Sequence, residues 1–448
     1  MKTFIAWSLI TVGTARIWSA APGIDPAAPT DAVQITPAYI LLLVESLRTN
    51  HPALRAAGAR AEAATANVAG VRTWENPTVS FGAAAASPRG TRLSEDGDLI
   101  YGLEQKLPLF GKPQAAKRVA EAEAATANAG VDYQFQLLRR DLTKALFQTV
   151  IAGRTVDLGK EDLSWLQAET ALAENRHRTG PGTLIEVLKL QTERDKRADQ
   201  IRTEAAQLAD ARVVLNRLLN RDFHAVWPRL ELPPMAPPLE YGVELDSFAT
   251  NQHPRLAVLR GEIQQARAMV AATRRSRLPD VSLGLEGRQY SGDGGFREGI
   301  FTVSMTFPWA NGDKYRNDLE RDRARLRAAE LAVADLELSA REEVHHLAVL
   351  IDAARRQALL YRDQLIPQAE LTLATAQASW EANRGPLNDV LDTRRLLLDG
   401  QLLFTKAVAE QFQALSDLSL LIGRDNLEAL LKRNAPAGTT VPNPPPGR

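Results

Sequence analysis

The 448-residue chain contains an internal duplication, and this feature constrains its fold more than any other. Four short segments of the first half recur in the second half in the same order, each offset by about 200 residues. The matching segments are 50–54 and 252–256, 72–80 and 274–282, 107–111 and 307–312, and 219–222 and 422–425. One such pair could arise by chance, but four pairs in one order indicate a duplicated structural unit.

Proline-rich stretches divide the chain. Residues 227–240 are crowded with proline and predict an extended linker, because proline lacks an amide donor and restricts φ. The first structural repeat is then residues 22–226, and the second is residues 241–433. Residues 434–448 have a similar composition and predict a flexible tail.

The N-terminus is typical of a signal peptide, which we place at residues 1–21. Lys2 supplies a positive charge, residues 4–12 form a short apolar core, and residues 19–21 are small. A short buried helix is the alternative. No later apolar run reaches the roughly 20 residues of a membrane-spanning helix, so a mature chain that crosses a membrane must use strands.

The composition excludes several classes of function. Lys plus Arg and Asp plus Glu both number 54, and this balance argues against a nucleic-acid partner. The absence of cysteine excludes disulfides, thiolate metal sites and a lipid-modified N-terminal cysteine. There is no HExxH, Walker or GxSxG motif, so we predict no enzyme activity and no cofactor.

Histidine positions do not predict a metal site. His345 and His346 are adjacent, and on a helix their side chains diverge by about 100°. Glu342 with His346, or His177 alone, could contact a metal ion, but a hydrated helix surface explains these residues equally well.

Each half predicts a helix, two strands, a long helix, a turn and a helix. Residues 39–72 form the first helix, and residues 113–176 and 314–382 form the two long ones, with a kink at Pro367. A helix of 65 to 70 residues is about 100 Å long, far beyond an ordinary globular core. The two shorter helices of each half together match the long one, so we expect them to stack into a second rod beside it.

Four segments alternate between apolar and polar residues with the period of a strand. They are residues 76–84, 99–107, 279–290 and 299–307. Each has about 9 to 11 residues, the length of a tilted transmembrane strand. Phe301, Val303 and Met305 share one face, and Thr302 and Ser304 share the other. This pattern predicts the wall of a water-filled barrel, although a half-buried sheet of a soluble domain also alternates.

Four strands cannot close a barrel, and an open sheet edge is not tolerated in hydrocarbon. Other copies of the chain must therefore complete the barrel, and three copies would supply twelve strands. Residues 88–90 and 291–295 would form surface-facing loops.

Two predicted helix-turn-helix tips, at residues 176–188 and 380–392, share a pattern of a turn residue, a short polar stretch and an apolar-acidic helix start. Gly180 and Asn383 tolerate left-handed φ and predict helix ends. Pro181 and Pro386 predict the start of the following helices.

With these tips, the duplication and the two strand pairs, the chain resembles the TolC-type outer-membrane efflux family over nearly its whole mature length. Residues 103–112 and the alanine-rich helix after them resemble the heavy-metal (CzcC/CusC-like) branch of that family. The resemblance implies a mainly α fold with transmembrane β-strands: a shared trimeric β-barrel in the outer membrane lipid, joined to a long periplasmic α-helical barrel.

The resemblance also implies an exit duct for substrates, most readily heavy-metal cations, that works with a periplasmic membrane-fusion adaptor and an inner-membrane RND-type pump. It places a periplasmic gate at Asp389 and Asp392, with Glu186 at the matching position of the first tip. The adaptor-docking residues would be Arg178, Gly180, Pro181, Asn383, Arg384 and Gly385.

Three alternatives remain. A sibling duct could serve multidrug efflux or type I secretion. A periplasmic adaptor would carry one α-hairpin within a single β-rich body, whereas this chain predicts two hairpins in tandem. A purely structural coiled-coil protein would leave the four alternating strands without a function.

Overall fold

A computed structural model describes residues 32–71, 74–85, 97–239, 242–290 and 294–423. The predicted signal peptide, the predicted loop at 88–90, most of the predicted loop at 291–295 and the predicted C-terminal tail lie outside these residues. No helix in the described part is long and apolar enough to cross a membrane.

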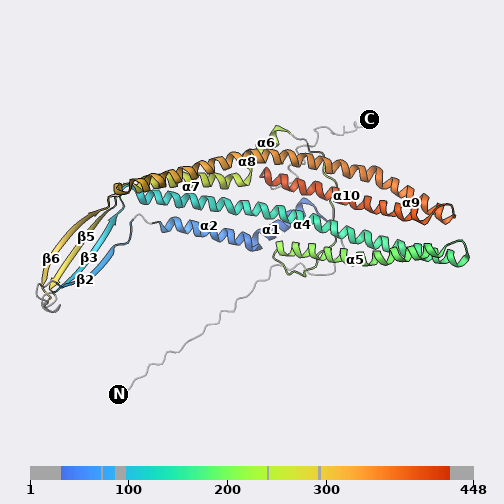
Figure 1. Ribbon diagram of the computed structural model, residues 1–448, viewed down its shortest axis with the longest axis horizontal. Helices are drawn as coiled ribbons and strands as arrows, with labels where there is room; N and C mark the ends of the chain where they lie inside the picture. The colour runs from blue at the N-terminus through green and yellow to red at the C-terminus, as the bar shows by residue number, and fades with distance from the viewer. Residues whose placement is uncertain (1–31, 72–73, 86–96, 240–241, 291–293, 424–448) are drawn as a thin grey trace, which may run out of the picture.

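The molecule is an elongated body with a sheet at one end and two helical hairpins at the other (Figure 1). The helices of the first half are α1 Pro37–Asn50, α2 Pro52–Gly70, α4 Lys112–Thr179 and α5 Leu184–Leu218. Those of the second half are α6 Val243–Gln252, α7 Pro254–Ser276, α8 Gly312–Leu360, α9 Ile366–Glu381 and α10 Leu387–Leu421. The predicted duplicated order of helix, hairpin, long helix, turn and helix is therefore confirmed.

The long helices hold the rods together. Helix α4, with 68 residues, packs against α2 towards the sheet and against α5 towards the tip, as the summed helix lengths predicted. It also packs against α7 and α10 of the other half, so the two repeats share one body. One apolar core draws on both halves, and a second core lies between the helical hairpins near their tips.

The predicted first helix at residues 39–72 is wrong as a single element. The chain breaks at His51, whose φ of −69° and ψ of 123° are extended, and α2 begins at Pro52. Proline fits this first helical position because its missing amide has no intrahelical acceptor there. The break recurs between α6 and α7 at His253 and Pro254.

The predicted interruption near Pro367 is present as a π-helical turn, η3 Tyr361–Leu365, between α8 and α9. Pro367 cannot donate to the carbonyl one turn earlier. The Ile366 amide instead donates to the Tyr361 carbonyl five residues back, which widens the helix locally.

The four strands form one antiparallel sheet in the order β2 Thr78–Ala85, β3 Gly97–Leu107, β5 Val281–Tyr290 and β6 Phe296–Met305. The bounds differ from the predicted ones by two or three residues at several ends. The pairing of β3 with β5 joins the two repeats. The short helical turns η1 Leu109–Gly111 and η2 Pro308–Asn311 connect the sheet to α4 and α8.

Strand register places like residues on like faces. Val79, Leu103, Leu285 and Phe301 align across all four strands, and their exposed fractions are 57%, 47%, 61% and 64%. Polar residues, including Glu104, Glu286 and Thr302, occupy the opposite face. Nothing in the described chain covers the apolar face, and β2 and β6 each leave one edge unpaired.

The proline-rich stretch is extended and anchored against the helices. Strand β4 Leu230–Glu231 pairs in parallel with β1 Val33–Gln34. The Gln411 side chain of α10 binds both the amide and the carbonyl of Ala236, each at 3.2 Å.

Candidate functional site

The first hairpin tip reverses the chain between α4 and α5. Gly180 ends α4 with a φ of 103°, and its amide donates to the Arg176 carbonyl at 3.0 Å. The sequence predicted that the second helix of this hairpin begins at Pro181, but α5 begins at Leu184. Thr183 caps it, because its hydroxyl accepts from the Glu186 amide while the Glu186 carboxylate accepts from the Thr183 amide.

The second tip closes differently. Asn383 adopts a left-handed φ of 59°, as its residue type predicted. The amides of Arg384 and Gly385 both donate to the Ser379 carbonyl, at 2.8 and 3.1 Å. Pro386 is the residue just before α10, and the Asp389 amide donates to its carbonyl at 3.2 Å.

The two tips are bound to each other by Arg176, which the sequence did not single out. Its guanidinium donates to the Trp380 carbonyl at 2.8 Å and to the Asn383 side chain, and it lies 4.5 Å from the centre of the Trp380 ring. Trp380 is 1% exposed, so this contact joins a buried aromatic of the second hairpin to the end of α4.

A second arginine makes the reverse connection further from the tips. Arg394 of α10 lies 3.0 Å from the Asp162 carboxylate and 5.1 Å from the Trp165 ring, both on α4. Arg197 of α5 lies 3.5 Å from the same carboxylate. Each hairpin thus contributes an arginine that is held by a tryptophan of the other hairpin.

The inner faces of the hairpins also hold a buried carboxylate, Glu169. Burial raises its pKa, the hydrogen bond from Gln377 at 2.9 Å lowers it, and the Glu381 carboxylate raises it again. The net effect is a raised pKa. Its second oxygen has no hydrogen-bond partner among the described residues.

Asp389 and Asp392 are exposed and lie one turn apart on the first turns of α10. Asp392 pairs with Arg395 at 3.2 Å, and Arg395 also reaches Glu193 of α5 at 2.9 Å. Asp389 has no ion-pair partner within the described ranges. Glu186 differs from both, because its carboxylate is engaged in capping α5.

The remaining predicted docking residues lie at the extremity of the molecule. Arg178, Pro181, Asn383 and Arg384 are exposed, and Gly385 is partly exposed. Beside them, the first turns of α5 and α10 enclose a groove of about 390 Å³. Ile185 and Leu188 on α5 line it and are 66% and 53% exposed, and Lys189 crosses to Asn388 at 3.3 Å. The sequence analysis did not predict these apolar groove residues as part of the functional surface. Their spacing of three residues at the start of a helix could have indicated them, because it places both on one helix face.

Across the residues that the structure describes, no cluster of three or more His, Asp or Glu side chains is placed to hold a metal ion. The exposed tip groups include carboxylates, guanidiniums and apolar side chains. Such an arrangement can attract ions and contact another protein.

A duplicated chain with an exposed apolar sheet at one end and long helical hairpins at the other defines a subunit of a membrane channel extended by a helical tube. The family model for outer membrane efflux proteins matches residues 43–221 and 247–424, most of both repeats. The chain therefore belongs to the outer membrane efflux protein family. It is an outer-membrane channel protein with a periplasmic helical body, and proteins of this family are not enzymes.

Two relatives illustrate the range of the family. Protein CyaE of Bordetella pertussis is 26% identical over 380 residues, which cover 81% of this chain and 75% of CyaE. The cobalt-zinc-cadmium resistance protein CzcC of Cupriavidus metallidurans is 22% identical over 326 residues, which cover 71% of this chain and 75% of CzcC.

The fold is also that of the solved structure of CusC, studied for its transmembrane channel formation. The TM-score is 0.74 at 16% identity, over 86% of this chain and 92% of CusC. Membership of the TolC-type family is thus confirmed, whereas the heavy-metal branch stays a prediction.

Proposed function

We propose that three copies of this chain close a twelve-stranded barrel in the outer membrane and form an exit duct for heavy-metal cations. The observation that carries the proposal is the sheet, which has one continuous exposed apolar face and two unpaired edges. Further copies satisfy both features, because they pair the edges and turn the apolar faces to lipid.

The hairpin tips are the proposed periplasmic entrance. Three copies would bring three Asp389 and three Asp392 carboxylates to the mouth, where a ring of negative charge favours cations. Glu186 is less suited to such a ring because it caps α5. The exposed tip residues and the groove beside Ile185 and Leu188 offer docking contacts for a periplasmic membrane-fusion adaptor, which would link the duct to an RND-type pump.

The metal cargo is supported by two observations: the likeness of residues 103–112 to the heavy-metal branch, and the match to a cobalt-zinc-cadmium resistance protein. The match to CyaE covers more of the chain, so the cargo needs a direct test.

The test is a growth-inhibition panel on a strain that lacks this chain, with divalent and monovalent metal ions beside dyes, detergents and antibiotics. We expect sensitivity to metal ions that the wild-type chain restores. Sensitivity to dyes and drugs alone would replace the metal cargo by multidrug efflux. Unchanged growth together with loss of a protein from the culture medium would indicate secretion.

A further inference from the structure

The junction between the strands and the helices is strongly basic, although the whole chain carries no net charge. The described residues of this junction are 70–71, 74–77, 109–118, 270–280 and 306–316. They include eight basic side chains and three acidic ones. The basic residues are Lys112, Lys117, Arg118, Arg274, Arg275, Arg277, Lys314 and Arg316, and the acidic ones are Glu75, Asp280 and Asp313.

All three acids at the junction are already paired. Glu75 binds Lys106 at 2.9 Å, Asp280 binds Lys112 at 2.7 Å, and Asp313 binds Arg316. Arg275 donates to the Gly111 carbonyl at 2.6 Å. The excess positive charge therefore lies on the basic side chains of the junction that make none of these contacts.

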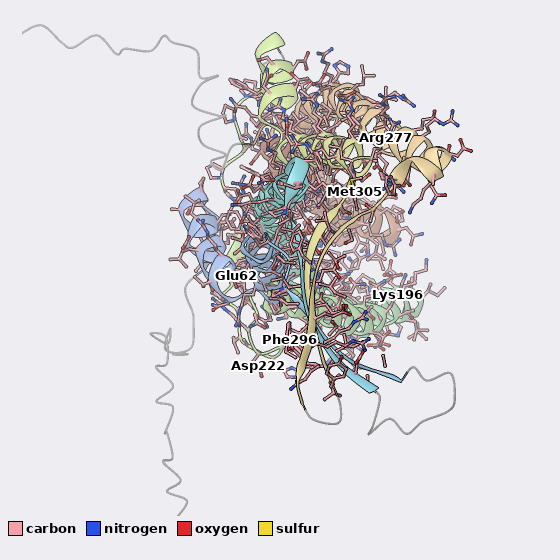
Figure 2. All side chains as sticks on the ribbon, turned by 90° about the vertical axis from the view of Figure 1, so that its left-hand side faces the viewer. Glu62, Lys196, Asp222, Arg277, Phe296 and Met305 are labelled. Carbon is pink, nitrogen blue, oxygen red and sulfur yellow. The ribbon has the colours of Figure 1, made fainter. Side chains whose placement is uncertain are left out.

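Five exposed cations have no acidic partner among the described residues, and we call them the basic collar. They are Lys117, Arg118, Arg274, Arg277 and Lys314. They lie on the first turns of α4 and α8 and at the end of α7, where these helices meet the sheet (Figure 1). Figure 2, viewed from the strand end, labels Arg277 and Met305 in the same upper part of the view, and β6 ends where Met305 pairs with Val281, four residues after Arg277.

Exposed apolar side chains lie at the same level of the molecule. Trp74, Phe110, Leu278 and Phe307 are 55%, 47%, 38% and 62% exposed. Phe307 has the same alternation parity as Phe301, Val303 and Met305 of the apolar sheet face. Aromatic and apolar side chains next to unpaired Lys and Arg are the combination found where a protein surface passes from acyl chains to charged headgroups.

We propose that the basic collar binds the phosphate headgroups of anionic phospholipids in the periplasmic leaflet of the outer membrane. The proposal rests on the proposed barrel, since only an inserted sheet brings the collar to the headgroup level. The collar lies on the side of the sheet where the helical rods begin, so it faces that leaflet. Clustered Lys and Arg near a membrane attract anionic lipid, and this attraction weakens with salt.

The test compares full-length proteins in nanodiscs of phosphatidylcholine mixed with phosphatidylglycerol. The collar variant is R274Q/R277Q/K314Q. The control variant K196Q/R202Q/R341Q removes three exposed cations that lie on α5 and α8, away from the collar. Arg341, for example, lies about 44 Å along α8 from the start of that helix. Native mass spectrometry counts the phosphatidylglycerol molecules that remain bound to each released oligomer.

We expect wild type and control to retain phosphatidylglycerol in preference to phosphatidylcholine. In the collar variant, the ratio of retained phosphatidylglycerol to retained phosphatidylcholine should be about tenfold lower than in wild type. High salt should lower the wild-type preference as well. Equal retention by the collar and control variants would overturn the proposal. So would unchanged lipid retention with an altered cation-to-anion permeability in planar bilayers, because the cations would then face the pore.

Insertion separates this proposal from the proposed function. A wild-type chain that forms no oligomer in the outer-membrane fraction would overturn both proposals. An oligomer that inserts but shows no preference for phosphatidylglycerol would overturn only the proposal that the basic collar binds anionic lipid.

Discussion

At the scale of single residues, both repeats start a helix with the same histidine-proline pair. Nδ1 of His51 accepts from the Ala53 amide at 3.2 Å, and Nδ1 of His253 accepts from the Arg255 amide at 3.0 Å. A ring nitrogen can accept only when it is unprotonated. Each histidine therefore caps its helix in the neutral form, a role that the motif alone had not indicated.

The more buried cap, His253, predicts a pH dependence. Burial lowers the pKa of His253, and the charge of Arg255 lowers it further. The unfolded chain then binds more protons below about pH 6.5, so the stability from this cap is complete above that pH and is lost as pH falls. We expect His253→Asn to retain a cap at pH 8, because asparagine also caps helices. Between pH 8 and about pH 5, the melting temperature of this variant should fall by less than that of wild type.

Thermal unfolding followed by circular dichroism at both pH values measures this difference. His224→Asn, at an exposed histidine, is the control and should follow wild type. If H253N and wild type lose the same melting temperature, the cap does not titrate in this range.

The exposed acids of α10 give a second residue-scale prediction. Asp389→Asn with Asp392→Asn should lower the cation-to-anion permeability ratio of the reconstituted channel by roughly threefold, because the proposed ring loses its charge. Planar-bilayer reversal potentials measure this ratio. The matched change Asp195→Asn with Asp199→Asn, at exposed acids of α5, should leave it unchanged. An equal effect of both pairs would refute a ring at the tips.

At the scale of elements, helix ends are decided by local chemistry that differs between the repeats. In both tips two amides donate to one carbonyl, that of Arg176 in the first and that of Ser379 in the second. The first hairpin has Gly180 at the left-handed position and a capping box at the start of α5, whereas the second has Asn383 at the left-handed position. Gly182 shows how tight the first turn is. An added Cβ would lie 2.9 Å from the His177 amide nitrogen and 3.0 Å from the Arg176 carbonyl carbon.

Two glycine substitutions should therefore change the stability of the protein in opposite directions. Gly182→Ala should destabilise the first tip by about 1 to 3 kcal/mol, because backbone atoms must move. Gly130→Ala, in the interior of α4 with nothing within 4 Å of the new carbon, should stabilise by about 1 kcal/mol through helix propensity. Thermal unfolding reports both changes, and limited proteolysis locates the first at the tip. A stable, protease-resistant G182A would show that the turn can relax without cost.

At the scale of the whole molecule, the sheet is incomplete in a single chain. Its apolar face is exposed while its polar face carries ion pairs such as Arg288 with Glu298 at 3.3 Å. This is the inverse of a soluble sheet, whose apolar face lies against a core. The sheet therefore needs lipid on one face and water on the other.

Neighbouring residues of β6 test this arrangement. Phe301→Glu places a charge on the apolar face and should abolish or strongly reduce the heat-modifiable oligomer in outer-membrane fractions. Thr302→Glu places the same charge on the polar face and should leave the oligomer in place. Gel electrophoresis of heated and unheated membrane samples distinguishes the variants. Equal tolerance of both changes would mean that the Phe301 face does not contact lipid.

The sequence alone determined the repeats, the four strands and their two faces, and the matched lengths of the rods. These properties follow from local periodicity, since alternation assigns residues to faces and helix length scales with residue number. It also identified the positions of Gly180 and Asn383, whose left-handed φ depends on residue type.

Only the tertiary structure decided how these elements meet. Arg176 and the Trp380 carbonyl that it binds are 204 residues apart, and Arg394 and Asp162 are 232 apart. Such contacts depend on the relative rotation and axial position of the two hairpins, which no local pattern specifies. The same reason applies to the pairing of β3 with β5, because it requires both repeats to be in place before their strands can align.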